Sequence, residues 1–253
     1  MRARRYVLEL ATLTARLRHM PDVILIHGAL GTIDQLQPLA AALAAHETRR
    51  LIHRIEFEGH GSTPSDAPYA THRFAANIRA FMVEKGIACA SLFGYSMGGY
   101  VALALAAEAP ELVASVATLG TKLAWSPDVA LKETSRLDAP TIRAKVPQFA
   151  DALETRHARS GGWEQVLAKT AAYMTSLGES PTLDAAIIAG ISQPARLMVG
   201  DRDAVVTIEE TRDAARSMRN GQFAVLPDTP HPFEQVRVPL LVAHLNELFD
   251  AVE

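Results

Sequence analysis

Short runs of consecutive apolar residues alternate along this chain with longer segments whose apolar residues recur at helical spacing. Runs that are apolar at every position, rather than at every second one, are typical of strands buried on both faces. These runs are Val23 to Ile26, Ala90 to Phe93, Val113 to Leu119, Arg196 to Val199 and Phe223 to Leu226. The alternation predicts an α/β protein, a doubly wound and mostly parallel sheet with helices on both faces.

The helical segments between these runs carry clear apolar faces. Ile33, Leu36, Leu39 and Leu43 share one face, as do Phe74, Ile78, Phe81 and Met82. The stretch from Tyr6 to Leu17 shows a weak alternation, from which we expect an edge strand or hairpin.

The alternation stops after Gly120, and residues 122–183 are too many for an ordinary connection. Pro147 is suited to open a helix that carries Phe149 and Leu153, and a second helical pattern begins at Trp163. We therefore expect a helical cap at 122–183, inserted into a core formed by 1–121 and 184–253.

Composition excludes several classes of function. The formal charge of −3 provides no basic face for a nucleic acid backbone. The apolar region from Val101 to Leu119 is interrupted by Glu108 and Pro110, so no membrane span is expected. The single cysteine, Cys89, cannot form an internal disulfide and fits a reducing compartment, which makes the cytoplasm the expected location. The oligomeric state is left open.

The most specific motif is Gly94-Tyr95-Ser96-Met97-Gly98, which follows a predicted strand and opens a predicted helix. A serine on such a sharp turn has a strained backbone and projects above the sheet edge, while the flanking glycines let strand and helix approach closely. The turn also places the Met97 amide at a helix N-terminus, where developing negative charge is favoured. Ser96 is therefore the candidate nucleophile.

With this motif the chain resembles the serine-nucleophile branch of the α/β-hydrolase superfamily, from about residue 22 to the end. His27-Gly28-Ala29-Leu30-Gly31 looks like the family's oxyanion loop. The resemblance implies that the amides of Ala29 and Met97 form an oxyanion hole. His27 is expected to brace this loop, and His60, in a second loop similar to one of the family, is expected to be structural.

A candidate base and acid follow the last two predicted strands. His231 follows the strand that ends at Leu226 and directly precedes Pro232, in a stretch similar to the family's catalytic-histidine loop. Gly200-Asp201-Arg202-Asp203 matches the family's Gly-x-x-Asp turn, so Asp203 is preferred to Asp201 as the acid. The family's other location for the acid holds Gly120 and Thr121, which carry no carboxylate.

These assignments predict a carboxylesterase-like hydrolase that acts on a small-molecule ester through an acyl-enzyme on Ser96, with no metal or cofactor. The cap would roof an apolar substrate pocket, and five residues are candidates to line it: Tyr95, Trp125, Trp163, Tyr173 and Met174.

Three alternatives stay open. Hydrolysis of a carbon–carbon bond is one, although Tyr95 and Phe233 stand where such hydrolases tend to carry asparagine and tryptophan. A cofactor-free lyase would need basic residues facing an acidic substrate, for which Lys122, Arg202 and Arg79 are available. The third is a ligand receptor that uses the same fold without catalysis.

Overall fold

A computed structural model describes residues 20–46 and 49–252 of the chain. Its strands form one parallel sheet in the order β2-β1-β3-β4-β5-β6. Their bounds are β1 (Asp22–Ile26), β2 (Ile52–Ile55), β3 (Ala90–Tyr95), β4 (Val113–Leu119), β5 (Ala195–Gly200) and β6 (Gly221–Leu226). The prediction of a doubly wound parallel sheet is confirmed. All carboxyl ends of the strands lie at one edge, where side chains from distant segments can meet.

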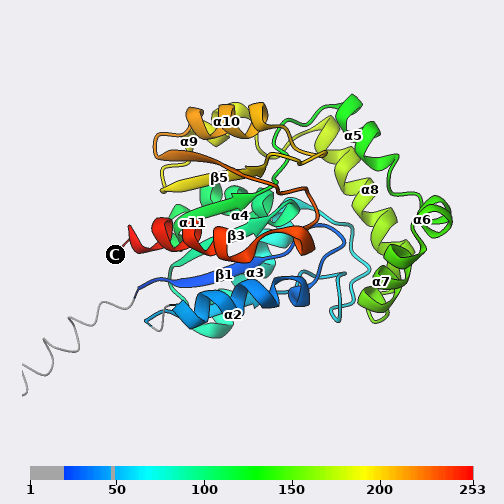
Figure 1. Ribbon diagram of the computed structural model, residues 1–253, viewed down its shortest axis with the longest axis horizontal. Helices are drawn as coiled ribbons and strands as arrows, with labels where there is room; N and C mark the ends of the chain where they lie inside the picture. Colours follow the sequence, from blue (N-terminus) through cyan, green and yellow to red (C-terminus); the bar gives the residue numbers. More distant parts are fainter. Residues whose placement is uncertain (1–19, 47–48, 253) are drawn as a thin grey trace, which may run out of the picture.

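Helices cover both faces of the sheet (Figure 1). One face packs against α2 (Gln37–His46) and α11 (Val238–Asp250). The other packs against α3 (Thr71–Lys85), α4 (Met97–Glu108), α9 (Ala185–Gly190) and α10 (Ile208–Ser217). Short 3-10 turns lie at η1 (Ile33–Leu36), η2 (Pro110–Leu112) and η3 (Phe233–Gln235). Helix α4 lies at the centre of its layer and is buried over most of its surface, which explains its unbroken apolar sequence.

Each apolar run singled out in the sequence lies in a strand, and only β2 was not predicted. Within β2, His53 and Arg54 interrupt the apolar pattern, because this edge strand is only partly buried. The expected helix from Ile33 begins as the 3-10 turn η1 before it continues as α2. The expected edge strand or hairpin at 6–17 lies outside the described residues. In the part of the chain that is described, none of the helices combines the length and apolar character needed to cross a bilayer.

Four of the five helices between β4 and β5 form the insertion (127–179), which lies beyond the carboxyl ends of the strands at the right of Figure 1. They are α5 (Pro127–Thr134), α6 (Ala139–Lys145), α7 (Pro147–His157) and α8 (Trp163–Glu179). Helices α7 and α8 begin at the predicted Pro147 and Trp163. Helices α5 and α8 pack closely at Gly178, where an added Cβ would lie 2.5 Å from the Cβ of Ala130.

Three buried imidazoles lie where the insertion meets the core. The ring centroid of His60 is 5.1 Å from that of His27 and 5.9 Å from that of His157, the last residue of α7. His157 accepts a hydrogen bond from the Gly61 amide on Nδ1 and pairs through Nε2 with the Leu30 carbonyl. These partners require the neutral tautomer with its proton on Nε2.

Burial keeps all three rings neutral. It lowers the pKa of His27 and of His157 to about 4. Hydrogen bonds to the Gly28 and Leu30 carbonyls act in the opposite direction, but burial has the larger effect. Burial and the neighbouring His27 hold the pKa of His60 well below its ordinary value. A proton on any of these rings would therefore have to be accommodated in an apolar interior.

We predict that acid destabilises this junction. A histidine whose pKa is lowered by folding binds fewer protons than the unfolded chain between the two pKa values, so the free energy of unfolding falls as the pH drops from about 6.5 to 4. For His27 alone the loss is about 3 kcal/mol at pH 4. Urea unfolding between pH 7 and pH 4 measures it. His157→Gln, which can keep both hydrogen bonds, reduces the pH dependence, whereas replacing the exposed His46 does not. Equal stability at pH 7 and 4.5 would contradict this prediction.

Candidate active site

The turn between β3 and α4 holds Ser96 in a left-handed backbone conformation, with φ 51° and ψ −116°. Non-glycine residues rarely adopt positive φ, so other contacts must hold it there. The Ser96 amide donates to the Leu119 carbonyl at 2.9 Å, and the Thr121 hydroxyl donates to the Ser96 carbonyl at 3.0 Å. The end of β4 and the residue two positions after it therefore bind both the amide and the carbonyl of Ser96.

Glycine is required at Gly98 because α4 starts against the end of β1. A Cβ at this position would lie 2.5 Å from the carbonyl oxygens of Ile26 and His27, which are backbone atoms that cannot rotate away. A Cβ at Gly94 would meet the backbone of Gly98 at 2.4 Å. This close approach lets the hydroxyl of Ser96 stand above the sheet edge.

Ser96, His231 and Asp203 form a hydrogen-bonded row. The Ser96 Oγ lies 3.3 Å from His231 Nε2, and His231 Nδ1 lies 2.8 Å from Asp203 Oδ2. The other oxygen of Asp203, Oδ1, accepts from the amides of Val205 at 2.8 Å and Val206 at 2.9 Å. With Nδ1 protonated toward the carboxylate, the lone pair of Nε2 faces the serine hydroxyl.

The carboxylate of Asp203 stays ionised although its side chain is only 2% exposed. Burial acts to raise its pKa, but the hydrogen bond and charge of His231, together with the Val205 and Val206 amides, outweigh burial. The pKa of Asp203 therefore lies below its ordinary value, and the carboxylate can stabilise an imidazolium at His231.

Two other acidic side chains near Asp203, those of Asp201 and Glu210, bind backbone amides of nearby loops. The Asp201 carboxylate accepts from the Thr229 amide at 3.0 Å, which orders the loop that leads to His231. Glu210 forms a capping box with Thr207 and also accepts from the Leu123 amide, at 3.0 Å, just before the insertion.

Tyr95 and Gly120 lie next to His231, and the sequence had not marked either residue for a role there. The Tyr95 hydroxyl donates to the His231 carbonyl at 2.7 Å. Gly120, with φ +61°, leaves the space that the row occupies, since a Cβ there would lie 3.1 Å from Asp203 Oδ2 and 3.2 Å from His231 Nδ1. Their positions in sequence, at the ends of β3 and β4, are the only signal that could have found them.

The expected oxyanion loop is held by the insertion. Leu30 has a positive φ of 59°, and its carbonyl accepts from Arg156 Nη1 at 2.8 Å and from His157 Nε2 at 3.1 Å. Ala29, the residue before it, lines a cavity at Ser96 together with Met97. Both expected oxyanion residues therefore lie beside the serine, and helix α7 fixes the loop that carries Ala29.

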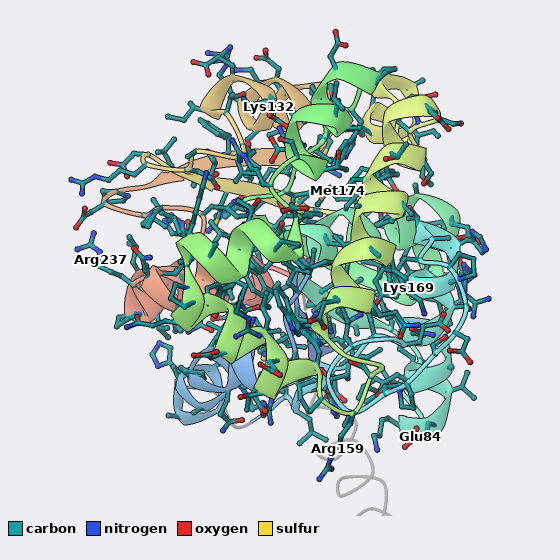
Figure 2. All side chains as sticks on the ribbon, turned by 90° about the vertical axis from the view of Figure 1, so that its right-hand side faces the viewer. Glu84, Lys132, Arg159, Lys169, Met174 and Arg237 are labelled. Carbon is teal, nitrogen blue, oxygen red and sulfur yellow. The ribbon has the colours of Figure 1, made fainter. Side chains whose placement is uncertain are left out.

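The cavity at Ser96 has a volume of about 50 Å³. Three of the predicted pocket residues, Trp125, Tyr173 and Met174, line it. Figure 2 looks onto the insertion from outside, with Met174 and Lys169 on α8 and Lys132 on α5. The Tyr173 hydroxyl forms a hydrogen bond with Thr71 Oγ1 at 2.7 Å, so this side chain presents mainly its ring to the cavity.

Two predicted pocket residues do not line the cavity. Trp163 packs in a separate cluster within the insertion, with the Arg143 guanidinium 5.1 Å from its ring centroid. The ring of Tyr95 lies against Gly28 and Phe233, because its hydroxyl turns to the His231 carbonyl. For both, contacts inside the protein decide the orientation.

Polar residues that the sequence did not mark also line the cavity, among them Glu133 and Thr170. Of the three basic residues considered for an acidic substrate, only Lys122 lines it, and its Nζ lies 3.4 Å from Glu210 Oε2. Arg79 pairs with Glu108 and Arg202 with Asp228, both away from the cavity. Residues 20–46 and 49–252 contain no group of three or more His, Cys, Asp or Glu side chains arranged to hold a metal ion.

Comparison with known proteins agrees with this fold. The family model of the alpha/beta hydrolase fold matches residues 21–160, more than half of the chain. A pimeloyl-acyl-carrier-protein methyl ester esterase of Chromobacterium violaceum is 29% identical over 254 residues, which cover 89% of this chain and 94% of that protein.

Two solved structures are similar in fold. A thermophilic esterase from Thermogutta terrifontis has a TM-score of 0.71 and 21% identity, covering 92% of this chain and 90% of that one. The 2-hydroxy-6-oxo-6-phenylhexa-2,4-dienoate hydrolase of Rhodococcus sp. has a TM-score of 0.74 and 19% identity, covering 91% and 90%.

We predict that the Tyr95 hydroxyl positions the imidazole. Tyr95→Phe removes the hydrogen bond to the His231 carbonyl and slows labelling of Ser96 by a fluorophosphonate roughly threefold to tenfold, since a typical hydrogen bond contributes about 1 kcal/mol. Tyr69→Phe is the matched control, because the Tyr69 hydroxyl donates to the Gly59 carbonyl at the same distance of 2.7 Å, away from the row. Equal labelling rates for the two variants would show that Tyr95 has no positioning role.

Proposed function

Because the chain belongs to the α/β-hydrolase fold family, we propose that it is a serine esterase that cleaves small carboxylic esters through a covalent acyl-enzyme on Ser96. The single observation that carries this proposal is the row from Ser96 Oγ through His231 to Asp203, with separations of 3.3 and 2.8 Å. The similar full-length protein from Chromobacterium violaceum is an esterase, which supports the same reaction class.

In the proposed reaction, His231 Nε2 takes the proton of the Ser96 hydroxyl as Oγ attacks the ester carbonyl carbon. The amides of Ala29 and Met97 stabilise the oxyanion, and His231 then gives the proton to the leaving alcohol oxygen. This leaves an acyl-enzyme. Water attacks the acyl carbon while His231 takes one of its protons, and return of that proton to Oγ releases the carboxylic acid.

Asp203 supports both proton transfers. Its carboxylate holds the proton of His231 on Nδ1, so Nε2 is free to act as the base, and its charge stabilises the imidazolium that forms. The lowered pKa of Asp203 keeps it ionised across the neutral range. Its contribution is to orientation and charge, without taking the proton itself.

We propose that the insertion acts as the cap over this site and limits the substrate. The cavity of about 50 Å³ holds roughly four water-sized groups. Its wall is formed in part by α8 residues such as Tyr173 and Leu177. The proposed substrates are therefore esters with short acyl chains.

Replacing the nucleophile tests this function. Ser96→Ala is expected to abolish hydrolysis of short aryl and alkyl esters while its circular dichroism spectrum and unfolding midpoint stay close to those of the parent protein. Ser180→Ala, at the exposed end of α8, is the control and retains activity. If Ser96 reacts with a fluorophosphonate but no ester is turned over, the esterase proposal is wrong.

The two neighbouring aspartates offer a matched test of the acid. Asp203→Asn is expected to lower kcat by roughly four orders of magnitude at neutral pH, because the amide no longer holds the required tautomer of His231. Asp201→Asn, which alters contacts with the backbone of Thr229 and Asp228, is expected to stay within a few-fold of the parent. Steady-state kinetics on one short ester measures both, and similar losses would show that Asp203 has no special role.

A further inference from the structure

Two polar side chains of the insertion lie in the wall of the cavity at Ser96 without full hydrogen bonding. Glu133 comes from α5 and Thr170 from α8. Both helices face the viewer in Figure 2, where Lys132 marks α5 and Met174 marks α8. The rest of the wall that these helices provide is mainly apolar, so the pair forms a local polar patch.

Burial makes this patch unusual. The Glu133 side chain is only 8% exposed, and its Oε2 accepts from Arg136 Nη1 at 3.1 Å. Arg136 is itself 45% exposed, and within residues 20–46 and 49–252 no hydrogen bond reaches Oε1 of Glu133. Thr170 is completely buried, and its hydroxyl has no hydrogen-bond partner in the described part of the chain. Buried polar groups are nearly always paired, so an unpaired hydroxyl in the same cavity wall as the Glu133 carboxylate favours a polar ligand group there.

The position of the cavity shows which half of an ester it would hold. The leaving alcohol must receive its proton from His231 Nε2, so the alcohol lies on the His231 side of Ser96. The cavity wall includes Ser96 and both expected oxyanion residues, Ala29 and Met97, but His231 is not part of it. The acyl half of the substrate therefore extends into the cavity.

We infer that the short acyl group of the natural substrate ends in a hydroxyl group, which binds Glu133 and Thr170. This inference rests on the proposed esterase function. A hydroxyl can donate to a carboxylate and accept from another hydroxyl, so its chemistry matches both Glu133 and Thr170. A substrate carboxylate at the same place would be repelled by the negative charge of Glu133. Lys122, which also lines the cavity, is already paired with Glu210 and does not offset this repulsion.

Alkyl esters that differ only at the acyl end test this inference. Ethyl pentanoate and ethyl 4-hydroxybutanoate have matched shapes, as do ethyl butanoate and ethyl 3-hydroxypropanoate, and monoethyl succinate supplies the carboxylate. Proton release in a pH-stat gives kcat/KM for each. We expect the hydroxyl-ended ester of at least one pair to be preferred by about tenfold or more, and the succinate to be the poorest substrate.

Substitutions assign the preference to the two side chains. Thr170→Val keeps the shape and removes the hydroxyl, and Glu133→Gln removes the charge. Each is expected to reduce the ratio of kcat/KM for the hydroxyl-ended ester to that for its methyl-ended partner about threefold to tenfold. Thr175→Val and Glu164→Gln, at exposed positions of α8, are the matched controls and should keep the parent preference. Circular dichroism checks that each variant is folded.

A pair of fluorophosphonates separates this inference from the esterase function. One carries a butyl and the other a 3-hydroxypropyl group on phosphorus, and Ser96 Oγ displaces fluoride from either. If the hydroxylated probe labels Ser96 about tenfold faster but no ester is hydrolysed, the pocket inference stands and the esterase proposal fails. If esters are hydrolysed and neither the ester pairs nor the two probes differ, the inference about Glu133 and Thr170 is overturned and the esterase proposal stands.

Discussion

The site depends on one strained residue, Ser96, whose left-handed backbone is held by contacts from β4. The Leu119 carbonyl and the Thr121 hydroxyl bind its amide and its carbonyl. The conformation also requires that α4 start in contact with the end of β1. Position 98 must therefore be glycine, because a Cβ there would collide with the β1 backbone. Because the serine is fixed by contacts from the end of β4 and from Thr121 just after it, the edge of the sheet positions the hydroxyl opposite the imidazole.

The insertion contributes to the site in two ways. Its helix α7 donates from Arg156 and His157 to the Leu30 carbonyl, and so holds the loop that carries Ala29. Its helices α5 and α8 place Glu133 and Thr170 in the cavity wall. The junction with the core contains buried neutral imidazoles, which bind backbone groups without the cost of a buried charge. The insertion therefore contributes both to the position of the loop that carries Ala29 and to the wall of the cavity.

The predictions that held rest on local patterns. Buried parallel strands are apolar at consecutive positions, so five of the strands were visible, whereas the edge strand β2 contains His53 and Arg54 and was not. Helices α7 and α8 begin at the residues expected, while α5 and α6 were not predicted because they are short and mostly exposed. Trp163 was expected in the pocket, but its helical spacing does not say which partner its face meets, and it packs within the insertion.

The sequence by itself determined the five buried strands, the elbow at Ser96, and the residues expected to complete a row with it, since each depends on a pattern of a few adjacent residues. Only the tertiary structure decided that Tyr95 turns to the His231 carbonyl and that Glu133 faces the cavity. The physical reason is that apolar periodicity and turn motifs act over a few residues, whereas the wall of a cavity is set by how helices from distant segments pack against one another.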